Sequence, residues 1–364
     1  MKKILLLSNL FPSKKDPSFG TFVYTNYEQL KSFDYNVDLC VISKKNKGII
    51  SKLCIYISFF SKCFFYLTFR RYKFDFVYIH YLTISTIPLF LIMKLLRIKP
   101  KYAINIHGDD LVGKGYSHRI LSFTSGFILK NASCVIVPSD YFRKELFIRY
   151  PESIKNTPVL VNYSGGVNTD LFNTKKALSS RKLIYGYLGR IEEGKGWDDL
   201  LNAINLLQID NDVEFHFYGK GKQKDKLLEA IESNINKINI KYFGEVPHHL
   251  VPNVMKTFTY FVFPTYRESL GLVALESMSC GVPVIRSNIE PLNDIFCGLS
   301  PELTFTPGDI DEICKAINYS MLTKNDNYHY LRKKSVGLAE LYSSVNSKRK
   351  LDSFLHEVFY AEES

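Results

Sequence analysis

The sequence contains few cysteines, and their spacing suits neither a disulfide framework nor a zinc site. There are seven among 364 residues, an odd number, and no two of them form a C-x-x-C pair. They are Cys40, Cys54, Cys63, Cys134, Cys280, Cys297 and Cys314. Scattered thiols are typical of a reducing compartment, so we expect a cytoplasmic protein.

The chain also lacks low-complexity segments, internal repeats shorter than a domain, and a convincing signal peptide. The opening MKKILLLSNLF has an apolar run only from Ile4 to Leu7, and Ser8 and Asn9 then interrupt it without a small-residue cleavage site. We expect a buried first strand there.

Acidic residues are in the minority, and the formal net charge is +11. Such a balance favours polyanionic partners, which include nucleic acid, anionic lipid and phosphorylated small molecules. The basic residues are spread along the chain and are not interleaved with aromatics as in a nucleic-acid-binding module, so we expect no nucleic-acid partner.

Continuous apolar runs alternate with segments of helix length, which is the pattern of parallel strands covered on both faces by crossover helices. The expected strands of a first domain are KILLLSN, NVDLCVIS, FDFVYIH, KYAINIHG, ASCVIVPS and TPVLVNY, and those of a second are KLIYGYLG, VEFHFYG, INIKYFG, YFVFP and VPVIRS. With 46% hydrophobic residues, the chain is long enough for two cores. We therefore predict two doubly wound α/β domains, residues 1–168 and 169–340, facing across a ligand cleft at the carboxyl ends of their strands. Residues 341–364 should form a helix that packs back on the first domain.

Two stretches of the first domain, 51–73 and 81–101, are apolar enough to leave their environment open. Both could be core helices of the sheet domain, or the first could lie on a membrane with Arg70, Arg71 and Lys73 near anionic headgroups. A true span is disfavoured by charged residues and a proline inside these stretches. These are Lys52, Lys62, Pro88 and Lys94.

The second domain carries two cations on one loop. Arg190 and Lys195 lie between a strand ending near Gly189 and a helix that we expect to start near Trp197. A forked guanidinium and an ammonium at this place suit a diphosphate and could neutralise charge that develops on a leaving group. The alternative is a solvated loop with helix-capping charges.

The segment YRESLGLVALES carries two carboxylates around a helix start. The amides of Ser269, Leu270, Gly271 and Leu272 would form an anion site at the helix N-terminus. Glu276 could then accept hydrogen bonds from a ribose diol, and Glu268 from hexose hydroxyls. The alternatives are a surface role for Glu276 and an N-cap role for Glu268.

Taken together, LGRIEEGKGWDDLLNAI, the segment from YFGEVPHHL to GVPVIRS, and NYSGGVNTDLF resemble the group 1, family four retaining glycosyltransferases of the GT-B fold. The resemblance covers nearly the whole chain and is weakest from about 44 to 100. It implies that Arg190 and Lys195 bind the diphosphate, that Glu276 binds the ribose, and that Glu268 binds the donor sugar. The amides of 269–272 match the family's backbone cradle for sugar and phosphate.

The same resemblance implies roles for further residues. Gly244 and Val246, in YFGEVP, lie where the family holds the nucleobase. His107, in INIHGDD, would contact the donor's hexose ring, and Asp110 matches an acidic position that orients an acceptor hydroxyl or a loop. Gly20 would allow close backbone approach to the phosphates, although this chain has Phe19 and Thr21 where many members have a second glycine.

The implied activity is a retaining, metal-independent hexosyl transfer from a UDP- or GDP-linked sugar, with no cofactor. His107, Arg190, Lys195 and Glu268 would form the catalytic set, and the sequence has no D-x-D motif in a suitable context for a metal. The acceptor would be a saccharide, or one linked to polyprenyl diphosphate, in O-antigen or capsule synthesis at the inner face of a bacterial membrane. Open alternatives are a nucleotide-sugar epimerase or hydrolase of the same fold and a non-catalytic nucleotide-sugar binding protein.

Overall fold

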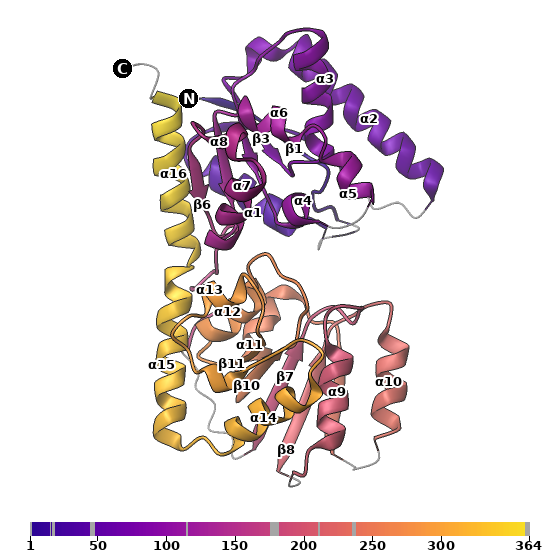
Figure 1. The fold of residues 1–364 in the computed structure, drawn as a ribbon, viewed down its shortest axis with the longest axis vertical. Coiled ribbons are helices and arrows are strands. Elements are labelled where there is room, and N and C mark those ends of the chain that lie inside the picture. Colours follow the sequence, from indigo (N-terminus) through magenta and orange to yellow (C-terminus); the bar gives the residue numbers. More distant parts are fainter. Residues whose placement is uncertain are drawn as a thin grey trace. The chain divides into compact units, whose positions relative to one another are not determined.

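The computed structural model describes residues 2–14, 16, 19–43, 48–113, 116–174, 182–209, 212–234 and 238–360. The chain divides into two compact units, each with its own sheet (Figure 1). Unit 1 comprises residues 1–165 and 347–364, and unit 2 comprises 166–346. The boundaries therefore fall at 165 and 346, where the sequence predicted 168 and 340.

Unit 1 is built on a six-stranded parallel sheet of order β2-β1-β3-β4-β5-β6. Its strands are β1 (Lys3–Ser8), β2 (Asn36–Val41), β3 (Phe76–His80), β4 (Tyr102–Asn105), β5 (Cys134–Val137) and β6 (Val159–Val161). All six coincide with the continuous apolar runs of the sequence.

Helices cover both faces of this sheet. One core joins the sheet to α2 (Ile49–Thr68), α3 (Ile87–Leu95), α6 (Ser125–Lys130) and α7 (Asp140–Arg149), and the other joins it to α1 (Thr21–Lys31) and α16 (Ser344–Tyr360). Leu351 and Leu355 of α16 are fully buried against the sheet, which is why the end of the chain belongs to unit 1. The short helices of this unit are α4 (Asp109–Val112), α5 (Tyr116–Leu121), α8 (Pro151–Ile154), η1 (Arg71–Lys73) and η2 (Ile84–Thr86).

Unit 2 has a second six-stranded parallel sheet, of order β12-β11-β10-β7-β8-β9. Its strands are β7 (Leu183–Leu188), β8 (Val213–Tyr218), β9 (Asn239–Gly244), β10 (Tyr260–Phe263), β11 (Val284–Ser287) and β12 (Thr304–Phe305). The sequence predicted five of them, and the two-residue β12 was missed. Two parallel, helix-covered sheets confirm the predicted α/β fold.

The helices of unit 2 pack around this sheet. They are α9 (Trp197–Leu206), α10 (Lys224–Glu232), η3 (His248–Leu250), α11 (Val251–Met255), α12 (Leu272–Ser279), α13 (Leu292–Ile295), η4 (Pro301–Leu303), α14 (Ile310–Met321) and α15 (Asn325–Leu341). One core joins α9, α10 and α14 to the sheet.

The two apolar stretches behave differently. In α3, Pro88, Leu89, Ile92 and Met93 are buried, as expected of a core helix. In α2 only Phe59, Cys63 and Leu67 are buried, so one side of this helix packs in the core of unit 1 and much of the rest is exposed. By length and composition, α2 is the one helix in the described part of the chain that could cross a membrane.

Each sheet has a position where neighbouring strands are not consecutive in the chain, so that the loops after them diverge. In unit 1 this position lies between β1 and β3, and in unit 2 between β7 and β10. Ligands of open parallel sheets bind at such positions, at the carboxyl ends of the strands. The predicted loop cations follow β7, and the predicted glutamates follow β10.

Candidate functional site

The loop that carries both cations is fixed to the loop that carries the carboxylates. The backbone amide of Tyr266 donates a 3.0 Å hydrogen bond to the carbonyl of Gly194. Gly196, the N-cap of α9, has φ +66°, and a Cβ atom there would lie 1.9 Å from the carbonyl oxygen of Pro264. Glycine is therefore required where the two loops touch, because any side chain would force them apart.

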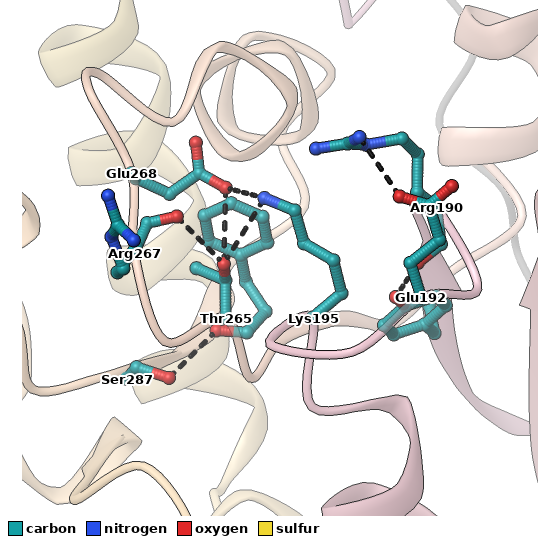
Figure 2. Close-up of polar contacts among 9 residues, drawn as sticks. Arg190, Glu192, Lys195, Thr265, Arg267, Glu268 and Ser287 are labelled. Carbon is teal, nitrogen blue, oxygen red and sulfur yellow. Dashed lines mark hydrogen bonds and ion pairs between the residues drawn. The ribbon is translucent and has the colours of Figure 1, made fainter. Parts of the chain in front are cut away.

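Lys195 and Glu268 form an ion pair at this contact, and their side chains meet over Thr265 (Figure 2). Nζ of Lys195 lies 2.6 Å from Oε1 of Glu268 and 3.4 Å from the hydroxyl of Thr265, which itself lies 3.2 Å from the same carboxylate oxygen. The two charged side chains are only 22% and 18% exposed. A partly desolvated pair of this kind holds both groups in a defined place.

Arg190 lies on the same loop but is held differently. Its Nη1 donates a 3.0 Å hydrogen bond to Glu192, and its carbonyl accepts one of 3.0 Å from the hydroxyl of Tyr187. The side chain remains 68% exposed. Because the backbone is fixed and the exposed ion pair is weak, the guanidinium is available to a stronger anionic partner.

The start of α12 presents a row of backbone amides. Gly271 is the N-cap, in the left-handed conformation at φ +75°. Within the described residues, the amides of 269–272 donate no hydrogen bond to the protein. The alternative role of Glu268 as N-cap is therefore wrong, and the four amides are free to bind an anion.

Glu276 lies one turn into α12 and is only 15% exposed. One of its carboxylate oxygens lies 3.3 Å from Nε2 of His248, a residue of η3. This contact raises the pKa of His248 above its ordinary value, and partial burial opposes the rise. The alternative interpretation, in which Glu276 is a surface residue, does not fit this environment.

The predicted base-contacting residues lie at the end of β9: Gly244 is its last residue, and Val246 follows two positions later. Gly244 has φ +78°, and its carbonyl accepts a 2.8 Å hydrogen bond from the amide of Gly219. The pairing of Lys220 with Glu245 at 2.6 Å also joins the β8 and β9 ends. These contacts fix the backbone at the carboxyl edge of the same sheet.

The predicted residues of unit 1 gather where β3 and β4 end. Asp110 accepts hydrogen bonds from the amides of His107, at 2.9 Å, and Leu82, at 2.8 Å. His107 also lies against His80, with 2.9 Å between the ring nitrogens. Burial lowers the pKa of His107 to about 3 and raises that of Asp110 to about 6, so the imidazole is neutral at pH 7.

Gly20 is the N-cap of α1, with φ +81°. A Cβ atom there would lie 3.0 Å from the backbone of Leu10, which closes the loop between β1 and α1. The predicted approach of Gly20 to the phosphates of a donor stays a prediction.

In the described part of the chain, no group of three or more His, Cys, Asp or Glu side chains is arranged to hold a metal ion. The seven cysteines are free thiols, and Cys40 and Cys63 lie in contact at 3.6 Å between their sulfur atoms.

Residues 168–335 match the description "Glycosyl transferases group 1". The match covers 168 of the 364 residues of the chain, so this part of the chain is similar to the family. The resemblance stated from the motifs is therefore confirmed at the level of the family, and the matched range contains all the predicted site residues of unit 2.

Curated relatives of the chain align with it over part of their length. A 2-deoxystreptamine N-acetyl-D-glucosaminyltransferase of Streptomyces fradiae is 30% identical over 36% of this chain and 32% of its own. The O-antigen chain mannosyltransferase B of Escherichia coli is 28% identical over 53% and 52%. A 41.2 kDa protein of unassigned function in the cps region of Klebsiella pneumoniae is 24% identical over 78% of each chain. The alignments span 32% to 60% of the length of the first four relatives.

Solved structures match the chain along nearly its whole length. The sucrose-phosphate synthase of Thermosynechococcus elongatus has a TM-score of 0.76 at 17% identity, over 99% of this chain and 100% of that one. HepE of Anabaena, in complex with UDP and glucose, has a TM-score of 0.73 at 16% identity, over 98% and 100%. At such identities the likeness shows the fold, GT-B, and not the substrate.

Sequence reasoning did not single out Thr265, Glu192, His248 or His80 as site residues. His80 lies at the end of a strand and Thr265 just after one. This position was the signal by which the sequence could have indicated them as site residues. The histidine pair in VPHHL was visible, but nothing local in the sequence links it to a glutamate 28 residues later.

The contact between the two loops predicts a large difference between two glycine substitutions. Gly194→Ala and Gly196→Ala both place alanine at positive φ, but a Cβ atom at Gly194 meets nothing within 4 Å. Gly194→Ala should cost about 1–2 kcal/mol. Gly196→Ala should cost about 1–3 kcal/mol more, because the clash with Pro264 adds to the strain. Urea unfolding followed by the fluorescence of Trp197, the single tryptophan, measures both. Equal losses would contradict the contact.

The contact between His248 and Glu276 predicts a titration change. Glu276→Gln removes the carboxylate that raises the pKa of His248, so the imidazole should titrate at lower pH than in the wild type, as measured by NMR. A raised histidine pKa adds stability below the unfolded pKa that is lost as pH rises through the folded pKa, so the wild type should lose this small contribution above about pH 6.5.

The matched control is Glu245→Gln, which removes a neighbouring charge that pairs with Lys220. It should leave the His248 titration close to that of the wild type. An unchanged titration in Glu276→Gln would show that the two side chains are not in contact in solution.

Proposed function

We propose that this protein is a group 1 glycosyltransferase that transfers a hexose, with retention of configuration, from a nucleoside-diphosphate sugar to a saccharide acceptor. The acceptor is proposed to be carried on a polyprenyl diphosphate during surface polysaccharide synthesis at the inner face of a bacterial membrane. The names of the Escherichia coli and Klebsiella pneumoniae relatives support the setting.

The observation that carries the donor part is the pair of loops at the carboxyl ends of β7 and β10. Lys195, Arg190 and the free amides of 269–272 supply positive charge and hydrogen-bond donors, and Glu268 and Glu276 supply acceptors. A nucleoside-diphosphate sugar presents the complementary groups in one molecule, namely two phosphates between two polyols.

In the proposed reaction, the protein provides electrostatic stabilisation. As the bond between the sugar and the diphosphate breaks, negative charge grows on the leaving oxygen, and Arg190 and Lys195 neutralise it. Lys195 is then shared between the diphosphate and Glu268, which holds a sugar hydroxyl. A cation placed beforehand need not reorganise during the reaction, which is why a fixed loop is an advantage.

The acceptor hydroxyl is proposed to attack on the face that the nucleotide leaves, and an oxygen of the leaving phosphate takes its proton. This route needs no carboxylate nucleophile. Metal independence is part of the proposal, because two cations occupy the role that a divalent ion fills elsewhere. His107 is proposed to contact the hexose, and Asp110 to hold its loop.

Two alternatives share the donor site. An epimerase or hydrolase of the same fold would consume nucleotide sugar without an acceptor, and a non-catalytic binding protein would bind it unchanged. Incubating the enzyme with donor alone distinguishes the first from a transferase, which should hydrolyse donor far more slowly than it transfers sugar to its acceptor.

Calorimetric titration with UDP and GDP in the presence of EDTA tests the donor site. One nucleotide should bind without metal, and Glu276→Ala should weaken it at least about tenfold, because a buried carboxylate that binds a diol with two hydrogen bonds is lost. Glu302→Ala, which removes an exposed carboxylate of η4, is the matched control and should bind like the wild type. If neither nucleotide binds to the folded protein, the proposed function is wrong.

The proposed membrane contact rests on the exposed side of α2. Ile50, Leu53, Ile57, Phe64 and Phe65 are all exposed and recur at the spacing of one broad helix face. Their number makes an apolar patch larger than isolated surface residues would give.

Aromatic and basic residues border this patch. After α2 come the exposed Phe69 and Tyr72, and Arg70 and Arg71 stack on the neighbouring Phe65 and Tyr72 rings. Aromatic rings and cations together fit an interface with anionic headgroups. We propose that α2 lies in that interface and does not span the bilayer.

Cosedimentation with phosphatidylglycerol vesicles at low salt tests this contact. The double variant Ile57→Ser/Phe64→Ser should bind at least about tenfold more weakly, since burial of each side chain contributes on the order of 1 kcal/mol or more. The matched control is Leu322→Ser/Tyr330→Ser, which changes exposed apolar residues of unit 2. Equal sedimentation of both variants would contradict the proposed surface.

A further inference from the structure

A second histidine lies directly behind the predicted sugar-contacting histidine. His80 is the last residue of β3 and has no solvent-exposed surface. β3 is one of the two strands at the position where the loops of unit 1 diverge. Nδ1 of His80 lies 2.9 Å from Nε2 of His107. The proposed mechanism gives His80 no role of its own.

The two rings are arranged for a hydrogen bond in their common plane. They are nearly parallel, at 15°, with centroids 5.1 Å apart. Face-to-face stacking would bring ring atoms to about 3.5–4.0 Å and the centroids closer than observed. The short distance joins two nitrogen atoms at facing ring edges, as in an N–H···N hydrogen bond.

Only one proton can lie between these nitrogens, so two arrangements are possible. Burial lowers the pKa of both rings, and both are neutral. If His80 donates, its own Nε2 carries no proton and His107 is protonated on Nδ1. If His107 donates, the proton of His80 is on Nε2, and Nδ1 of His107 is an acceptor.

The surroundings of Nε2, the other ring nitrogen of His80, decide between these two arrangements. Its Nε2 is buried and has no hydrogen-bond partner among the described residues. A buried N–H without an acceptor is rarer in proteins than an acceptor without a donor. The arrangement in which this Nε2 carries no proton therefore avoids the more costly defect.

We propose that His80 is a positioning residue that donates to Nε2 of His107 and so holds His107 as the neutral tautomer protonated on Nδ1. The side chain of His107 then faces the substrate as a hydrogen-bond donor to a sugar or phosphate oxygen and cannot act as a general base. The hydrogen bond from His107 to the substrate rests on the proposed function, whereas the tautomer assigned to His107 does not.

The backbone supports the same orientation. Asp110 accepts from the amides of both His107 and Leu82, which follow β4 and β3. The carboxylate thus joins the two strand ends, and the rings of Phe22 and Tyr81 lie 4.5 and 4.8 Å from His107. The imidazole of His107 is held on several sides, and His80 alone contacts its Nε2 among the described residues.

Long-range ¹H–¹⁵N NMR correlation spectra of the histidine rings test the proposal without any substrate. In the wild type, Nδ1 of His107 should carry the proton, and a proton on Nε2 instead would overturn the proposal. His80→Asn places an amide nitrogen near the position of Nδ1 and should preserve the tautomer. His80→Phe removes the donor, and His107 should lose its single tautomer; if it keeps it, His80 is not what holds the ring.

His216 provides the internal control, because it is also buried but is held by Glu214 at 2.8 Å in unit 2. Its signals should be the same in all three proteins, which separates a local change from misfolding. In the transfer assay, kcat should fall about tenfold or more in His80→Phe, with KM nearly unchanged, and should recover in His80→Asn. Equal loss in both variants would overturn the positioning role.

If the wild type shows the expected tautomer but binds neither nucleotide, the proposed function fails and the assignment of the proton stands. If nucleotide binds and His107 carries its proton on Nε2, the inference about His80 fails and the proposed function stands.

Discussion

The parallel pairing of β7 with β10 is the constraint on which the proposed donor site depends. These strands are neighbours in the sheet but far apart in the chain, with β8 and β9 lying between them in sequence. Their loops leave from adjacent strand ends, and the contact at Gly196 fixes one against the other. Lys195 and Glu268 are 73 positions apart in sequence and still meet at 2.6 Å. No helix or turn brings them together, so the site exists only when the whole sheet of unit 2 has formed.

The charges of this site are paired with each other before any ligand is considered. Lys195 pairs with Glu268, Arg190 with Glu192, and Glu276 with His248. The proposed donor, a nucleoside-diphosphate sugar, would have to replace or share these contacts, so part of its binding free energy would be offset. The pairs differ in exposure, and the weakly held Arg190 is the easiest to recruit. Pairing also limits the self-repulsion of like charges that a loop of free cations would suffer.

Much of the fold could be predicted because its strands are buried on both faces, and burial leaves continuous apolar runs in the sequence. β12 was missed because two residues carry no such pattern. The exposed side of α2 could not be decided, since apolar residues occur on several sides of this helix and do not show which face meets the sheet. At the site, residue types and spacing indicated Arg190, Lys195, Glu268 and Glu276. Their protein partners, Thr265 and His248 among them, depend on tertiary contacts that spacing does not encode.

The polar groups at the strand ends of the two units differ in charge and in burial. In unit 2 the site is built from charges, which are partly exposed and neutralised in pairs. In unit 1 the corresponding strand ends carry buried imidazoles that stay neutral because a charge there would lack solvation. A charged site can bind and release a diphosphate because its own ion pairs compete with the ligand. A neutral hydrogen-bond donor beside a sugar orients the sugar without adding charge. In the proposed reaction, the loops of β7 and β10 would supply the electrostatic stabilisation, and His107 would orient the sugar. The proton between His80 and His107 then matters because it decides whether that orientation comes from a donor or an acceptor.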